Sequence, residues 1–395
     1  CIGGGRVALI WAQPDGWFFA GLAALCALLA VHFAAFFRAQ APRRRTLEWI
    51  AFVDPPAPRF GCGPAEHCPL RAVHVLLLAF AALVTAAGQL LARVPPELLR
   101  SILLSADLIG RLEFLLIYAV SPAVCMLTVF FAARRLTDHP VLPYLAALLM
   151  ALDLNFDPEL LPFLLLAAAF LLRYWGAVQT APAFSCALEL LAMTAYLALG
   201  AYIHPPLLLA AALLFIPVAF AAVYRAVHAD APRRALRLAG TLVGYFAMLA
   251  LWMTLIRIPG ALLETGLPFF QTLADARFWA GLGGQIRAAC TALTAPDAVY
   301  LAIFSLPLQL YALFSAAACV WLAVRRRDLC AGLMAWLFIA GTALWALGIA
   351  PPVFGSLLPT VYLWSCWLRR SRGMIFGAAL LIAFALAGNV MLFLL

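Results

Sequence analysis

The chain has 395 residues, of which 67% are hydrophobic and 11% are charged, with a net charge of +9. Soluble domains carry about 25% charged residues, so this chain has too little polar surface to be a water-soluble globule. Disorder is excluded as well, because disordered segments are poor in apolar residues. The composition predicts an all-α, polytopic membrane protein. All 26 basic residues are Arg. In a membrane protein the placement of these residues indicates the topology. We therefore do not expect nucleic acid among the partners.

Apolar segments near the length that a bilayer core requires recur along the chain. They predict a bundle of about twelve transmembrane helices, at 17–38, 72–92, 113–133, 141–153, 158–172, 184–203, 206–224, 238–256, 298–324, 330–349, 356–368 and 374–395. The fourth, fifth and eleventh segments are short. We expect the fourth and fifth to form a tight pair, joined by LNFDPE, that does not cross the membrane fully.

The Arg residues are distributed unevenly over the predicted loops. With the loop at 38–71 placed inside, nineteen of the 26 Arg residues fall on inner loops and seven on outer loops. Acidic residues are enriched on the outer side. This asymmetry follows the positive-inside rule. It predicts an integral protein of the bacterial inner membrane with both termini outside.

Three parts of the chain differ in organisation. Residues 1–71 form an extra N-terminal helix and a basic cytoplasmic loop. Residues 72–260 form a membrane core with a first outer loop at 93–112, and residues 261–395 continue from a long outer loop at 257–297 into the C-terminal helices. Both outer loops have amphipathic character, most clearly in PPELLRSILLSADLIGRLE, where apolar residues recur at a spacing of three to four. We therefore expect interfacial helices in both outer loops.

Common catalytic and transport motifs are absent from the sequence. There is no P-loop, no HExxH and no GxSxG motif. Glu189 and His32 are the ionisable residues within the predicted helices, and we expect Glu189 to snorkel or to pair with Arg173. Six cysteines in apolar stretches are interpreted as small core residues: Cys26, Cys125, Cys186, Cys319, Cys330 and Cys366.

The order of segments within 72–260 resembles the membrane core of the GT-C superfamily of glycosyltransferases, in its mannosyltransferase and arabinosyltransferase style. A helix and an outer loop are followed by GRLEFLLIYAVSPAVCMLTVFFAARRL, by VLPYLAALLMALDLNFDPELLPFLLLAAAFLLRYW and by LAMTAYLALGAYIHPPLLLAAALLFIPVAF. The resemblance implies transfer of a sugar from a polyprenyl-phosphate donor at the outer face. Two features depart from the family pattern: the acidic residue comes late in the first outer loop, and an extra helix at 17–38 precedes the matching region.

The resemblance also implies roles for individual residues. Asp107, or failing it Glu97, would be the catalytic base. Asp153 and Asp157 would assist or bind a divalent metal, whose identity is left open. The lipid phosphate and the rest of the substrate would be bound by candidates among Arg100, Arg111, His204, Arg257, Arg277 and Arg287. Each residue also has a plain structural interpretation, such as a solvated helix face for Asp107, turn chemistry for Asp153 and Asp157, or a polar residue at a hairpin tip for His204.

A non-enzymatic function is the alternative. The protein would then be a transporter or flippase-like carrier, or a membrane subunit of a larger complex. A carrier requires a water-filled path at mid-membrane, and Glu189 is the residue around which such a path would run.

Overall fold

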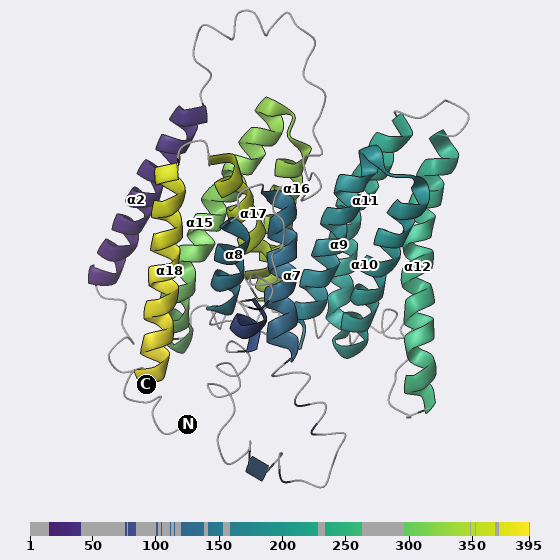
Figure 1. Cartoon of the computed structure of the whole chain (residues 1–395), viewed down its shortest axis with the longest axis horizontal. Helices are drawn as coiled ribbons and strands as arrows, with labels where there is room; N and C mark the ends of the chain where they lie inside the picture. The colour runs from purple at the N-terminus through teal and green to yellow at the C-terminus, as the bar shows by residue number, and fades with distance from the viewer. Residues whose placement is uncertain are drawn as a thin grey trace, which may run out of the picture.

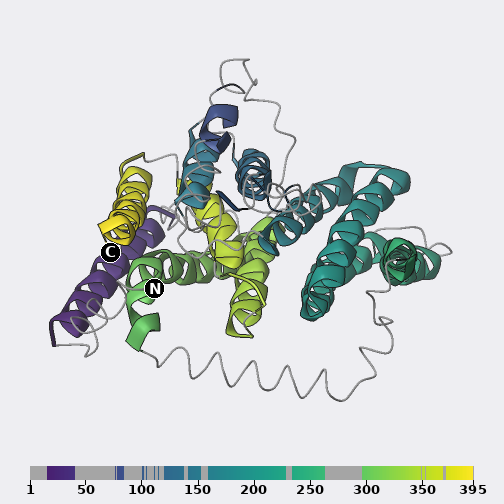
Figure 2. The same ribbon diagram turned by 90° about the horizontal axis from the view of Figure 1, so that it is seen from below.

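The computed structural model describes 16–40, 120–137, 141–152, 159–227, 234–262, 296–347, 349–351, 353–367 and 371–394, with 76, 78–83, 100, 101, 104, 111 and 114. In this part of the chain the regular structure is helical, as the fold class predicts. Figure 1 shows the helices running roughly along one direction, and Figure 2 views the same bundle from below.

The helices follow the hydrophobic segments closely. The described residues form eleven α-helices and one 3-10 turn. Their bounds are α2 Gly16–Gln40, α7 Ser121–Leu136, α8 Leu142–Ala151, α9 Leu161–Thr180, α10 Ala183–Ile203, η3 Pro205–Leu207, α11 Leu208–Val227, α12 Arg234–Leu262, α15 Pro296–Arg326, α16 Leu329–Ala346, α17 Val353–Trp367 and α18 Ser371–Leu394.

Six of the described helices contain a segment long and apolar enough to cross a membrane. These segments are Leu161–Val178, Ala183–Ile203, Pro205–Val227, Leu238–Ile256, Pro307–Arg326 and Leu329–Ala346. Four shorter apolar helices accompany them within the described residues. The protein is therefore a multi-pass integral membrane protein, while the predicted count of about twelve spans is not confirmed.

Helix α9 is longer than the sequence predicted. The expected end lay near 172, but the helix continues to Thr180. Arg173 can remain within an apolar helix because its guanidinium pairs with Glu189 of α10 at 2.7 Å. The prediction that this segment is too short to cross is therefore wrong.

The expected pairing of α8 with α9 is also wrong. Helix α8 packs mainly against α7, with a further contact to α17, whereas α9 packs mainly against α10 and next against α7. The buried side chains of α7 lie on several sides of the helix, from Cys125 and Val129 to Met126 and Phe130. Because α7 has apolar side chains on both sides, it separates the two helices that follow it.

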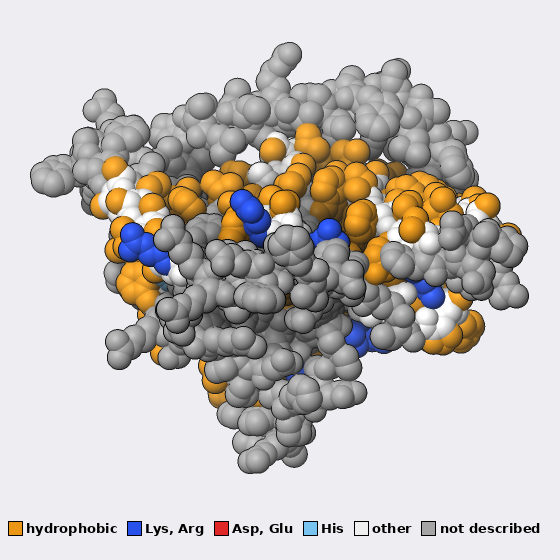
Figure 3. All heavy atoms as spheres, turned by 90° about the horizontal axis from the view of Figure 1, so that it is seen from above, with side chains coloured by type: hydrophobic (Ala, Val, Ile, Leu, Met, Phe, Trp, Pro, Cys, Tyr) orange, Lys and Arg blue, Asp and Glu red, His pale blue; other side chains and the backbone are white. Residues whose placement is uncertain are grey.

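Arg residues gather where several helices end. We call this the Arg-rich end, defined by Arg38 of α2, Arg134 and Arg135 of α7, Arg173 of α9, Arg225 of α11, Arg325 and Arg326 at the end of α15, and Arg327 after it. Figure 3 views the molecule from above and shows several Arg side chains and no coloured carboxylate on the described surface. The charge asymmetry predicted for the inner face therefore recurs in the described part of the fold.

Two groups of helices can be distinguished within the bundle. Helices α9 to α12 form one group, in which α10 packs against α9 and α12. Helices α15 to α18 with α2 form the other, in which α15, α16 and α17 pack against one another. Figure 1 shows the first group at the right and the second towards the left, with α7 next to the first group and α8 beside α17 and α18 of the second. One contiguous apolar core runs through both groups.

Candidate functional site

Most of the predicted outer-loop site lies outside the described residues. This applies to both candidates for the catalytic base, Asp107 and Glu97, and to Asp153, Asp157, Arg277 and Arg287. Arg257 lies in α12, where only its helical backbone is described. The roles assigned to these residues, including divalent-metal binding by the two aspartates, stay predictions.

The described positions of the first outer loop are helical. Arg100, Ser101, Leu104, Arg111 and Phe114 all have helical backbone. Arg100 and Leu104 are exposed, Arg111 is half-buried and Phe114 is buried. The two Arg residues are therefore on a segment that passes from the surface of the protein into its core.

His204 occupies a turn at the end of the bundle opposite to the Arg-rich end. It follows the last residue of α10, and its backbone N–H donates to the carbonyl of Gly200 at 2.8 Å. Its own carbonyl accepts from the N–H of Leu207 at 2.9 Å, closing the 3-10 turn that leads into α11. His204 thus lies at the tip between α10 and α11, as predicted, and substrate binding by its ring stays a prediction.

Glu189 forms the expected ion pair with Arg173. The Arg173 Nε donates to Glu189 Oε1 at 2.9 Å, and Nη2 lies 2.7 Å from the same oxygen. The Arg side chain is 44% exposed and the Glu side chain 16% exposed, and Glu189 Oε2 is buried without a hydrogen bond among the described residues. The pair links α9 to α10 near the Arg-rich end, and the carrier hypothesis that invoked Glu189 stays a prediction.

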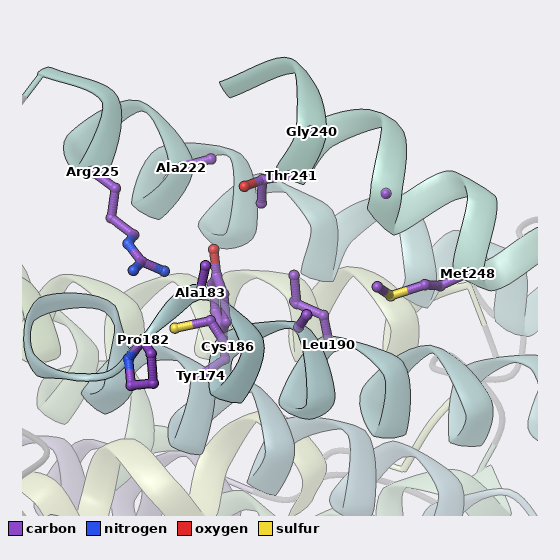
Figure 4. Close-up of a pocket in the computed structure, with 12 residues that line it drawn as sticks. Tyr174, Pro182, Ala183, Cys186, Leu190, Ala222, Arg225, Gly240, Thr241 and Met248 are labelled. Carbon is purple, nitrogen blue, oxygen red and sulfur yellow. The ribbon is translucent and has the colours of Figure 1, made fainter. Parts of the chain in front are cut away.

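A cavity of about 480 Å³ opens between α10 and α12 at the Arg-rich end. Its lining comes from four helices: Tyr174 of α9; Pro182, Ala183, Cys186, Ala187 and Leu190 of α10 and its N-cap; Ala222 and Arg225 of α11; and Gly240, Thr241, Gly244 and Met248 of α12. Figure 4 shows these side chains around a common space. Pro182, Ala183 and Gly240 are exposed and Leu190 is buried, so the mouth lies at the helix ends.

The sequence explains why space remains here. The facing residues of α10 recur at a spacing of three to four and are small, and those of α12 include Gly240 and Gly244. A Cβ atom added to either glycine would meet no atom within 4 Å. Leu190 and Met248 fill the interface further from the mouth, so the void is confined to the Arg-rich end.

Two aromatic side chains fix α12 in this position. The Trp252 indole N–H donates to the carbonyl of Leu191 on α10 at 3.0 Å, and the Tyr245 hydroxyl donates to the carbonyl of Ala211 on α11 at 2.8 Å. Buried indole and phenol groups require such partners. They hold α12 against two helices at once, so α12 is not free to close the cavity by moving towards α10 alone.

Arg225 supplies the charge at this cavity. Its Nη2 donates to the carbonyl of Ala181 at 3.2 Å, beside the start of α10. Figure 4 shows the guanidinium directed towards Cys186, whose thiol donates to the carbonyl of Ala177 at 3.7 Å. Among the described residues Arg225 has no carboxylate partner, so a positive charge stands beside a largely apolar space.

A second polar cluster joins the helices of the other group. The Trp364 indole N–H donates to the hydroxyl of Tyr311 at 2.8 Å, and this hydroxyl lies 2.8 Å from Nε2 of His32. The Tyr311 hydroxyl therefore accepts from the indole and shares a second hydrogen bond with the imidazole, whose direction depends on the tautomer of His32. All three side chains are buried, so the cluster ties α2, α15 and α17 together.

The turn between α15 and α16 carries a further buried contact. Asp328 N-caps α16, because its Oδ1 accepts from the N–H groups of Cys330 and Ala331 at 3.1 Å. Its Oδ2 accepts from the Tyr362 hydroxyl at 2.5 Å. Asp328 therefore caps α16 and links it to α17. The residue before it, Arg327, adopts a φ of 53°.

No group of three or more His, Cys, Asp or Glu side chains able to hold a metal occurs in the described part of the chain. The six predicted core cysteines form no disulfide in the part of the chain that the structure describes, and four of them are buried. Comparison with known proteins gives no match: no family model, no curated protein and no solved structure resembles the chain at a significant level.

Sequence reasoning missed both the cavity and the buried cluster. A signal for the cavity exists, since Ala183, Cys186 and Ala187 on one segment and Gly240 and Gly244 on another are small residues at helical spacing. For the cluster there is none of this kind, because His32 and Tyr311 are 279 positions apart in the sequence.

Proposed function

We propose that the protein is a membrane glycosyltransferase that transfers a sugar from a polyprenyl-phosphate donor to an acceptor at the outer face of the membrane. The site lies in the first outer loop, at the end of the bundle opposite to the Arg-rich end. Asp107 is the catalytic base, and Arg100 and Arg111 bind the donor phosphate.

The observation that carries the proposal is the helical backbone at Arg100, Leu104 and Arg111. Asp107 comes seven residues after Arg100 and four residues before Arg111, so on a continuous helix the three residues would share one face. A carboxylate between two guanidinium groups would combine a proton acceptor with two phosphate ligands. This combination suits displacement of a phosphate from a sugar.

The chemistry needs one proton transfer and one displacement. The acceptor hydroxyl oxygen forms a bond to the anomeric carbon, while the bond from this carbon to the phosphate oxygen breaks. Asp107 takes the hydroxyl proton as general base. The lipid phosphate leaves with the electron pair, and the Arg100 and Arg111 guanidinium groups stabilise its charge through bidentate hydrogen bonds.

The test measures release of polyprenyl phosphate by mass spectrometry. The purified protein in lipid nanodiscs is given polyprenyl-phosphomannose or polyprenyl-phosphoarabinose, with a total membrane lipid extract as acceptor. We expect Asp107→Asn to lower the rate by about 10²- to 10⁴-fold, the usual contribution of a general base. Glu159→Gln is the matched control, because it removes an exposed carboxylate elsewhere in the chain, and its rate should equal that of the wild type.

Two results would change the proposal. An unchanged rate in Asp107→Asn together with a loss in Glu97→Gln would move the base to Glu97 and keep the reaction. No release from either donor by the wild-type protein would contradict transfer of these sugars from a polyprenyl-phosphate donor.

A further inference from the structure

We infer that the α10–α12 cavity binds one anionic phospholipid from the leaflet at the Arg-rich end, with the lipid phosphate on Arg225 and an acyl chain along α12. This site is separate from the proposed sugar-transfer site and does not depend on it.

The phosphate position follows from Arg225 and its surroundings. The guanidinium stands at the mouth of the cavity, and its contacts to the Ala181 carbonyl and the Cys186 thiol leave further N–H donors among the five of an Arg side chain. The α10 helix starts at Ala183, which lines the same mouth. The first-turn N–H groups of α10 and the Arg225 charge therefore favour the same negatively charged group.

The chain position follows from the apolar part of the cavity. Further from the mouth than Arg225, the cavity is lined by Leu190, Gly244 and Met248, with small residues between them. The outer side of α12 exposes large apolar side chains, including Val243, Phe246 and Leu251. An acyl chain can thus leave the cavity along α12 while remaining in contact with apolar surface.

The charge at this end of the bundle selects the type of lipid. Two carboxylates at this end are already engaged, Glu189 by Arg173 and Asp328 by the Tyr362 hydroxyl, and the described side chains visible in Figure 3 include several Arg. Basic pockets between transmembrane helices on the positively charged side of a membrane protein are suited to anionic headgroups. A zwitterionic lipid carries a cationic group that would lie among these Arg residues, so an anionic lipid is favoured.

The test is native mass spectrometry of the detergent-solubilised full chain with equal amounts of phosphatidylglycerol and phosphatidylcholine. We expect one phosphatidylglycerol retained per chain in preference to phosphatidylcholine. Arg225→Gln should weaken retention about fivefold, the effect of one basic residue near an anionic lipid. Gly244→Leu should lower retention by a similar factor, because its side chain enters the space where a Cβ meets no atom within 4 Å.

Arg325→Gln is the matched control, since it removes an exposed Arg charge at the same end but outside the cavity. Equal retention of the two lipids, or the same loss in Arg325→Gln as in Arg225→Gln, would overturn the proposal. Displacement of the lipid by millimolar inorganic phosphate, with Gly244→Leu unaffected, would make this a site for free phosphate and also overturn it. Gly244→Leu retains the charge of Arg225. If Arg225→Gln fails to fold, the lipid retention of Gly244→Leu therefore tests the proposal.

Discussion

Glycine has opposite roles in the two helix groups. In the group formed by α15 to α18 with α2, Gly341 of α16 and Gly355 of α17 let two backbones cross in contact, since a Cβ on Gly341 would lie 2.7 Å from the Gly355 nitrogen. In the α9–α12 group, Gly240 and Gly244 face open space. The same residue type therefore permits close packing in one group and leaves a cavity in the other.

The polar groups of the two regions differ in the same way. The His32, Tyr311 and Trp364 side chains satisfy one another inside the core. Arg225 instead stands beside a cavity without a carboxylate partner among the described residues. Closed packing with satisfied polar groups indicates a structural region, and open packing beside a charge indicates a binding region.

The largest expected effect is at the crossing of α16 and α17. Gly341→Ala should destabilise the protein by about 1–3 kcal/mol, as overpacking in a close-packed core does, because the new methyl group must push α17 away. Thermal unfolding in detergent measures this loss. Gly332→Ala is the control on the same helix, since its Cβ would make an ordinary contact of 3.6 Å with the Ala323 Cβ. Equal melting temperatures of the two variants would contradict the close crossing.

The buried cluster should give the next largest effect. Tyr311→Phe removes the hydroxyl that joins Trp364 to His32 and leaves a buried indole donor without its partner. Such a loss costs about 1–3 kcal/mol. Thermal unfolding again reports it, with Tyr202→Phe at an exposed position of α10 as the matched control. If both variants melt at the wild-type temperature, the cluster does not stabilise the packing of α2.

The ion pair between α9 and α10 should respond asymmetrically. Arg173→Gln leaves the more buried Glu189 carboxylate without its charge partner, whereas Glu189→Gln leaves only the half-exposed Arg173. We expect Arg173→Gln to cost about 1 kcal/mol and Glu189→Gln less, because a charge stranded in the interior is the larger penalty. The melting temperatures of the single and double variants measure the difference, and the reverse order would contradict this account of the pair.

The smallest effect is expected at the cavity glycines. Gly244→Ala should stabilise the protein by about 0.5–1 kcal/mol, because alanine is the better helix former and its Cβ meets no atom within 4 Å. Its melting temperature is compared with that of Gly341→Ala. A loss of stability in both variants would remove the contrast between the two helix groups.

The sequence predicted the helices well because burial in a membrane requires long apolar segments. The predicted segment at 184–203 differs by one residue from α10, and that at 298–324 by two residues at each end from α15. The end of α9 was predicted near 172, whereas the helix continues through Arg173 to Thr180. The charge of Arg173 is accommodated in the helix because its partner Glu189 lies on the next helix.

The candidate sites were predictable only in part. The pairing of Glu189 with Arg173 follows from their positions near one end of adjacent helices and is confirmed. The cavity depends on how far α12 stands from α10, and Trp252 and Tyr245 set this distance through bonds to backbone carbonyls. Contacts of this kind depend on helix packing, which local sequence patterns do not specify.

The most direct test of the proposed function is mass spectrometry of the lipids that co-purify with the protein in mild detergent. We predict enrichment of polyprenyl phosphate or its glycoside over bulk phospholipid in the wild type. The enrichment should fall in Arg111→Gln and persist in Arg325→Gln and Arg225→Gln, which alter the other end of the bundle. Bulk phospholipid alone, or polyprenyl phosphate that is unaffected by Arg111→Gln, would contradict a donor site in the first outer loop.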